Sequence, residues 1–215
     1  MTTRAPAGPA SECIGAPRDD LCLDFMNTRY WRGSEPPTET LGSLDALLEW
    51  AAQSSGIEPA AIKRIGRRWH EDGHAGDAAF DEAIRLREVM YRVFGAVAGA
   101  KKPAPADIGA LNAALAEAPP RTRLVQNDAG FVWQVDRLAP SVTALLAPVL
   151  WSASDLLTAK RRERMRQCAN ERCLWLFLDD SKSANRRWCS MSACGNRAKA
   201  RRHYHKQKQA AEAGE

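Results

Sequence analysis

The sequence contains no long hydrophobic run. No segment reaches the about 18 consecutive apolar residues that suggest a membrane-spanning helix, so we expect no membrane partner. The N-terminal segment MTTRAPAGPASE is rich in alanine and proline, and it lacks the apolar middle of a secretory signal. We therefore expect a cytoplasmic protein in which residues 1–19 form a disordered leader.

Recognisable catalytic signatures are missing as well. There is no glycine-rich phosphate-binding loop and no nucleophile elbow. His70 and His74 stand four residues apart, but no Glu-x-x-His pattern accompanies them, which argues against a metal site there. These absences predict a protein that is not an enzyme. An enzyme with a catalytic site in the N-terminal part of the chain stays open as an alternative.

Charge is unevenly distributed along the chain. Residues 160–215 hold 15 Lys/Arg and 6 Asp/Glu, a net charge of +9, whereas residues 1–159 carry −4. A mildly acidic N-terminal part with a strongly basic C-terminal part is typical of a protein whose tail meets a polyanion. The alternative is a solvated basic helix without a partner.

Hydrophobic periodicity predicts a mainly α fold with a small β-hairpin (α+β). Apolar residues alternate on both sides of Asp128–Gly130, which predicts a hairpin of residues 122–127 and 131–136. Elsewhere apolar residues recur at steps of three and four, with a loop expected over residues 71–77. The last helical pattern runs to Arg166 with an interruption near Pro148. It predicts a continuous or nearly continuous connection into the cysteine-rich segment, without a flexible linker. Helices are expected over 44–55, 60–71, about 78–99, 105–118 and 141–166.

Cysteine is scarce, and its distribution predicts a metal site. Four of the 6 cysteines form two pairs with the same spacing, Cys168-x4-Cys173 and Cys189-x4-Cys194. Cytosolic thiols stay reduced, and two such pairs can close a tetrahedron around one structural Zn²⁺ per chain. Four protein ligands leave no position for water, so this zinc would not be hydrolytic. The alternatives are unrelated buried cysteines, ligation by a downstream histidine, and an iron–sulfur cluster.

Three aromatic residues lie between or beside the cysteine pairs. Trp175, Phe177 and Trp188 are expected to form a small core next to the metal, because the LWLFL segment is strongly apolar. The rival interpretation is that one of these rings stacks on a nucleic-acid base.

The segment after Cys194 predicts a helix over 196–209 that has almost no apolar face. Such a helix suits contact with phosphate groups, and a few side chains could reach base edges. We expect nucleic acid as the partner. The candidate contact residues are Lys182, Arg186, Arg187, Asn196, Arg197, Lys199, Arg201, Arg202 and Lys206.

Two motifs resemble those of a known family. Cys194-Gly195-Asn196-Arg197, with the preceding stretch from Arg186 to Met191, resembles the CGNR zinc-finger family, and Leu23 to Thr28 (LDFMNT) resembles the motif of its N-terminal ABATE domain. The resemblance implies an ABATE-like, mainly helical domain over 20–160. It also implies a CGNR-type zinc finger with a basic helix over 161–209, and a tail over 210–215. The family is described as stress-induced transcription regulators, which implies DNA binding through the finger.

The N-terminal part offers one polar cluster. Asp24, Asn27, Thr28 and Arg29 lie beside an apolar run and could form a site for a small-molecule effector, although such residues also serve as caps and turns. Our hypothesis is a zinc-dependent DNA-binding transcription regulator whose N-terminal domain senses an effector or a partner. The alternative is an RNA-binding, translation-linked protein. A single finger with one short helix would bind weakly alone, so a homodimer is expected.

Overall fold

The computed structural model describes residues 11–128 and 130–212, except for the side chains of 203, 205, 206 and 208–212. Most described residues are helical, which confirms the mainly α prediction. None of the described helices is both long and apolar enough to cross a membrane. The α-helices are α1 (Leu21–Met26), α2 (Leu44–Ser54), α3 (Pro59–Glu71), α4 (Gly73–Ala98), α5 (Pro105–Glu117), α6 (Val142–Leu145), α7 (Ala147–Thr158) and α8 (Asn196–Glu212).

The strands are short and antiparallel. They form three separate sheets, with the orders β1-β5-β4, β2-β3 and β6-β7. The strands are β1 (Ser11–Gly15), β2 (Arg29–Tyr30), β3 (Thr38–Glu39), β4 (Arg123–Asn127), β5 (Gly130–Asp136), β6 (Met165–Gln167) and β7 (Leu176–Leu178).

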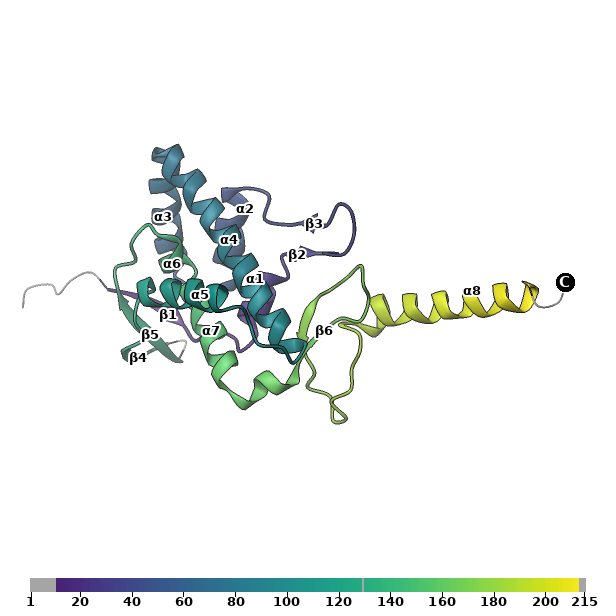
Figure 1. The fold of residues 1–215 in the computed structure, drawn as a ribbon. Helices are drawn as coiled ribbons and strands as arrows, with labels where there is room; N and C mark the ends of the chain where they lie inside the picture. Colours follow the sequence, from purple (N-terminus) through teal and green to yellow (C-terminus); the bar gives the residue numbers. More distant parts are fainter. Residues whose placement is uncertain (1–10, 129, 213–215) are drawn as a thin grey trace, which may run out of the picture.

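Helix α4 lies at the centre of the body, by which we mean residues 11–158 (Figure 1). Leu86, Met90, Val93 and Phe94 of α4 are buried at steps of three and four, so they form one apolar face. Helices α1, α2, α3, α5 and α6 all contact α4. Burying each such side chain contributes about 1.5–3 kcal/mol, and this core therefore holds the helices of the body together.

The predicted hairpin is present as β4 and β5, but a third strand joins it. Strand β1 pairs with β5, from Ser11 opposite Asp136 to Gly15 opposite Val132. The expectation of a disordered leader is therefore wrong for these residues, because Ile14 is fully buried and β5 supplies the partners for the backbone of β1. Residues 1–10 of that leader lie outside the described residues.

The loop expected over 71–77 is reduced to a single residue. Asp72 separates α3 from α4, and its carboxylate accepts a hydrogen bond from the Ala75 N–H (3.1 Å) as an N-cap. A Cβ on Gly76 would lie 2.8 Å from the Trp69 carbonyl oxygen. Because Gly76 has no Cβ, α3 and α4 can pack closely at this point. The sequence pattern alone had indicated a loop here.

The helix that we expected to reach Arg166 ends earlier, and other elements make the connection into the cysteine-rich segment. Helix α7 ends at Thr158, a 3₁₀ turn covers Lys160–Arg164, and the chain then continues as β6. Strand β6 pairs with β7 and contacts α4, and the side chain of Met165 is almost completely buried (1% exposed). The chain forms a strand here and not a helix, because the burial of Met165 and the pairing with β7 stabilise the extended backbone. The connection contains no long flexible linker.

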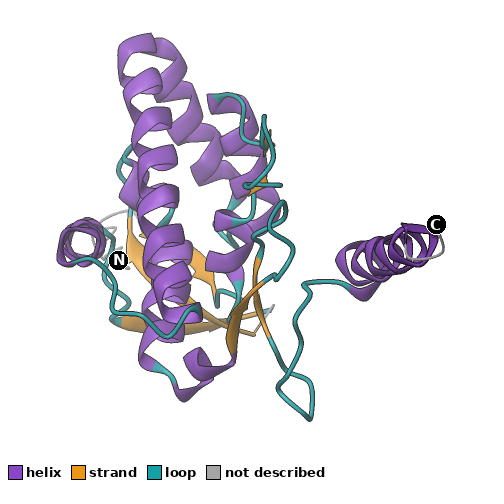
Figure 2. Cartoon of the chain, turned by 45° about the vertical axis from the view of Figure 1, so that its right-hand side comes forward, coloured by secondary structure: helices purple, strands orange, loops and turns teal. Residues whose placement is uncertain are grey.

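The finger, residues 165–212, begins with this β6–β7 pair and ends with α8. A single π-helical turn, Met191–Gly195, leads directly into α8. In both Figure 1 and Figure 2, α8 extends away from the body and the rest of the finger lies between them.

Candidate metal centre and nucleic-acid interface

The four predicted cysteine ligands lie together in space. Their Sγ atoms all fall within 4.8 Å of one another. The Cys173 and Cys189 Sγ atoms are 3.7 Å apart, and those of Cys189 and Cys194 are 3.8 Å apart. A regular tetrahedron with Zn–S bonds of about 2.3 Å has edges of about 3.8 Å. The donor set and its spacing therefore fit one zinc ion with four thiolate ligands.

Local backbone geometry shapes the first knuckle, residues 168–173. The Cys168 N–H donates to the Trp175 carbonyl oxygen (2.8 Å), and the Cys173 N–H donates to the Asn170 carbonyl oxygen (2.7 Å). Leu174 adopts a positive φ of 55°, which turns the chain sharply after the second ligand. These turns bring Cys168 and Cys173 to the same side of the knuckle.

The second knuckle, residues 189–194, is closed by a serine cap. The Ser190 hydroxyl accepts from the Ala193 N–H (3.3 Å), and the Ser190 carbonyl oxygen accepts from the Cys194 N–H (3.1 Å). The Asn170 Nδ2 group of the first knuckle donates to the Cys194 Sγ atom (3.5 Å). This contact links the two knuckles and orients a sulfur toward the centre of the cluster.

The electrostatics of the sulfur cluster also favour a cation. The hydrogen bond from Cys189 lowers the pKa of the Cys173 thiol to about 5, and the same contact raises the pKa of Cys189. Burial raises the pKa of Cys194 to about 11. Thiolates this close repel one another, so the four can ionise together only with a compensating positive charge. A bound zinc ion would supply that charge and hold the two knuckles together.

The small aromatic core beside the sulfur atoms is present, and it has one more member than predicted. Phe177 is buried, while Trp175 and Trp188 are half-buried against the same cluster. Trp31, from the loop between β2 and β3, also packs there. The body therefore completes the core of the finger, a role for Trp31 that the sequence reading missed because the two segments are far apart in the chain.

Asn27, one of the predicted effector residues, forms two hydrogen bonds with the finger. Because the Cys168 N–H is paired with Trp175, the alternation of an antiparallel ladder turns the N–H and C=O groups of Leu176 away from β6. The Asn27 side chain meets both groups, donating to the Leu176 carbonyl oxygen (2.8 Å) and accepting from its N–H (3.1 Å). The side-chain amide of Asn27 thus satisfies the free backbone groups of β7 in the way that a neighbouring strand would.

Two further contacts fix the first knuckle and the residue that follows it on the body. The Gly33 N–H donates to the Arg172 carbonyl oxygen (3.2 Å), and a Cβ at Gly33 would lie 1.8 Å from the Glu171 carbonyl oxygen. The Tyr91 hydroxyl of α4 donates to the Leu174 carbonyl oxygen (2.6 Å). Only a glycine allows this approach at position 33, so body and finger are seated closely against each other.

The other predicted effector residues also have structural partners. Thr28 Oγ1 donates to the Phe25 carbonyl oxygen (2.7 Å) and accepts from the fully buried Arg87 (3.0 Å). Asp24 forms an ion pair with Arg18. The Arg29 guanidinium lies 3.9 Å from the carboxylate of Glu88. The structure therefore places these side chains in separate interactions that support the fold.

A partly buried ion-pair network lies beneath these contacts. The Arg87 guanidinium pairs with Glu39 (2.5 Å) and with Glu88 (3.0 Å), and Arg32 also pairs with Glu88 (2.6 Å). Burial alone would raise the pKa of the Glu88 carboxyl, but the hydrogen bond and charge of Arg32 outweigh it and hold that pKa below its usual value. The Arg32 guanidinium also lies 3.7 Å from the centre of the Tyr91 ring. The network thus supports the tyrosine that binds the finger.

The predicted nucleic-acid contacts divide into two groups. Lys182 and Asn196 are exposed, as are all the predicted arginines and Lys199, while the side chain of Lys206 lies outside the described residues. Arg186 stacks on Phe177 (4.9 Å) and donates to the Cys189 carbonyl oxygen (2.7 Å), so it supports the finger. Within the described part of the chain none of the predicted basic residues forms an ion pair, and Arg187 and Arg197 lie over the rings of Trp188 (5.4 Å) and Trp31 (4.5 Å).

Comparisons with known proteins agree with this architecture. Residues 19–160 match the model of the ABATE family, whose description reads "Putative stress-induced transcription regulator". Residues 164–207 match the CGNR zinc finger. Both matches confirm the resemblance found in the sequence. A comparison with curated proteins finds no match for the chain.

Proposed function

Because this chain belongs to the ABATE family and carries a CGNR zinc finger, we propose that it is a zinc-dependent regulator that binds DNA through the finger. One observation carries the proposal. Helix α8 starts directly after Gly195, next to the ligand Cys194, and extends away from the body (Figure 1). Arg197, Lys199 and Arg201 are exposed near its start. A rigid, basic helix anchored at one end by a metal suits contact with DNA phosphates.

The body would control the direction of this helix. Gly33 binds the first knuckle, and Tyr91 and Asn27 bind the segment directly after it, at Leu174 and Leu176. The knuckle is joined to α8 through the metal cluster. A ligand or partner that shifts these segments of the body would therefore re-aim α8. A freely tumbling finger could not respond in this way, so the close seating supports effector control.

The proposal includes two further expectations. A single finger offers few phosphate contacts, so we propose that DNA is bound by a homodimer, which light scattering of the zinc-loaded protein with and without DNA would detect. We also propose that the chain is a binding protein and not an enzyme. The structural partners of Asn27 and Thr28 support that view, because these two side chains hold the fold together.

Binding to a random duplex DNA pool at several salt concentrations tests the proposal. The logarithm of affinity should fall linearly with the logarithm of salt, and Arg201→Gln and Arg202→Gln should each reduce the slope by about 0.9. Arg85→Gln, at an exposed position on α4, is the matched control and should leave the slope unchanged. An RNA competitor distinguishes the alternative partner. An affinity for duplex DNA that does not respond to salt would refute binding through α8.

A further inference from the structure

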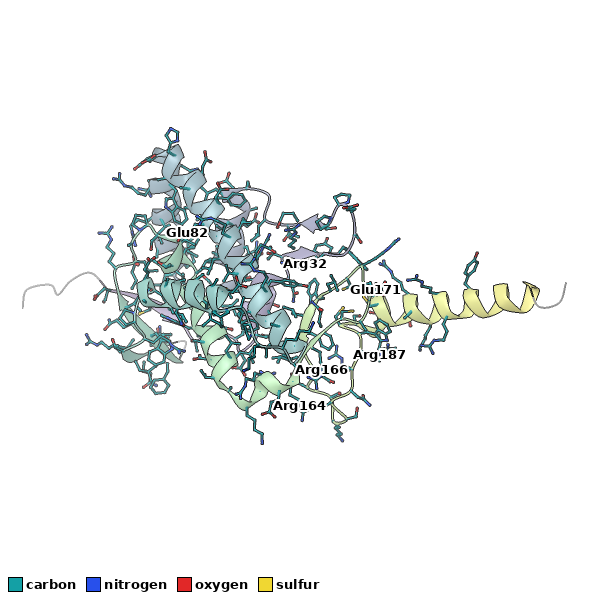
Figure 3. The ribbon with its side chains drawn as sticks, in the orientation of Figure 1. Arg32, Glu82, Arg164, Arg166, Glu171 and Arg187 are labelled. Carbon is teal, nitrogen blue, oxygen red and sulfur yellow. The ribbon has the colours of Figure 1, made fainter. Side chains whose placement is uncertain are left out.

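A cleft lies at the junction of the body and the finger. It has a volume of about 940 Å³ and is bounded by the β2–β3 loop at Trp31, by the first knuckle at Arg172, and by the start of α8 at Arg197. In Figure 3, Glu171 lies beside the start of α8, close to this opening. The volume is within the range of pockets that bind small molecules, and the walls come from three separate segments.

The charge of the cleft is strongly positive. Arg172, Arg197, Arg201 and Arg202 line it, and Glu171 is the single carboxylate among its lining residues. Within the described part of the chain, no carboxylate lies within ion-pair distance of any of these four arginines. Many arginines of the body, by contrast, pair with carboxylates, among them Arg32, Arg64, Arg87, Arg92 and Arg121.

Flat surfaces also line the cleft. The indole rings of Trp31 and Trp188 are half-buried in its wall, and the Arg197 guanidinium lies 4.5 Å from the centre of the Trp31 ring. Indole rings and guanidinium planes are the surfaces on which nucleobases stack. The small side chain of Ala198 faces the same space between the arginines. Unpaired guanidinium groups beside aromatic rings match a ligand that combines a phosphate with a planar ring.

We propose that this cleft binds a nucleotide, with its phosphate held by Arg172, Arg201 and Arg202 and its base against the indoles of Trp31 and Trp188. A free nucleotide and an unpaired nucleotide of a DNA strand present the same two groups. A base stacked inside an intact duplex cannot reach the cleft. The occupant would touch both the body and α8, so it would set the position of the helix that we propose for DNA binding. The cleft itself does not depend on that function.

Calorimetric titration of the zinc-loaded full chain tests this inference. The probes are AMP, adenosine, inorganic phosphate and a short single-stranded DNA. Arg172→Gln should weaken the binding of AMP or of the strand about tenfold, because a charge-assisted hydrogen bond to phosphate is lost. Arg172 is outside α8 and is not a zinc ligand, so zinc content should stay at one per chain. Arg85→Gln is again the control and should bind like the native protein.

The position of the ligand is read from the indole N–H signals in NMR spectra. Those of Trp31 and Trp188 should shift on binding, whereas that of Trp69, which donates to the Pro140 carbonyl oxygen (3.0 Å) inside the body, should not. Binding of AMP identifies a free nucleotide as the occupant, and binding of the strand alone identifies a nucleotide unit of DNA. Both results support the cleft.

Three results would overturn the inference. The first is that neither AMP nor the strand binds. The second is that Arg172→Gln binds these probes as tightly as Arg85→Gln does. The third is that adenosine or phosphate alone binds as tightly as AMP. Duplex DNA binding is measured in parallel on the same protein samples. If it persists while the nucleotide probes fail, the cleft proposal alone is wrong. If nucleotide binding persists while duplex binding does not, the proposed function is wrong and the cleft stands.

Discussion

Replacing Asn27 by alanine isolates the contact between the body and the finger. The substitution removes a donor and an acceptor that together satisfy the N–H and C=O groups of Leu176 (2.8 and 3.1 Å). Leu176 is fully buried, and Asn27 is only 4% exposed, so water does not readily replace the lost partners. Each backbone group left unsatisfied costs about 1–3 kcal/mol.

We therefore expect Asn27→Ala to lower the free energy of unfolding by about 3 kcal/mol, which corresponds to a fall in Tm of about 6–12 °C for a chain of this size. Thermal unfolding followed by circular dichroism measures the change. Hydrogen exchange at the Leu176 amide should accelerate at the same time, because that amide loses its acceptor. Zinc should stay bound, since no ligand is changed.

Asn112→Ala serves as the control, because Asn112 is exposed on α5 and the chemical change is the same. Such surface substitutions usually change stability by less than about 0.5 kcal/mol. If Asn27→Ala proved as stable as this control, and the Leu176 amide kept its protection, the assignment of Asn27 as the link between body and finger would be refuted.

Three further predictions concern the same region. Gly33→Ala should destabilise the chain by about 1–3 kcal/mol, because its Cβ would lie 1.8 Å from the Glu171 carbonyl oxygen; an unchanged Tm would contradict the close approach. Tyr91→Phe removes the 2.6 Å hydrogen bond to the Leu174 carbonyl oxygen and should cost about 1 kcal/mol in chemical unfolding, with no loss of zinc. Cys173→Ser should reduce zinc from one per chain to none in elemental analysis and make the finger sensitive to protease, because metal binding and folding of such a segment are coupled. A metal-free variant with a protease-resistant finger would show that the ion is not needed.

The relation between the two motifs of the chain has a functional consequence. The LDFMNT motif of the body ends with Asn27 and Thr28, and these residues serve the finger contact and the buried Arg87. Residues of this motif therefore help to hold the finger against the body.

The amino-acid sequence determined the metal centre and most of the helices. Ligand spacing such as Cys168-x4-Cys173 is a local property, because a short turn brings both sulfur atoms to one side whatever the rest of the chain does. The apolar face of α4 is local in the same sense, since its period follows from helix geometry. Both could be predicted without knowledge of the tertiary fold.

Only the tertiary structure decided how the parts are joined. Asn27 and Leu176 are 149 positions apart in sequence, and nothing in the pattern around either residue indicates the other. Strand β1 also pairs with a strand that is distant in sequence, since Ser11 lies opposite Asp136, and the sequence of the leader alone therefore indicated disorder. Trp31 and Arg172 form one cleft for the same reason. Contacts of this kind depend on the complementarity of two finished surfaces, which local periodicity does not encode.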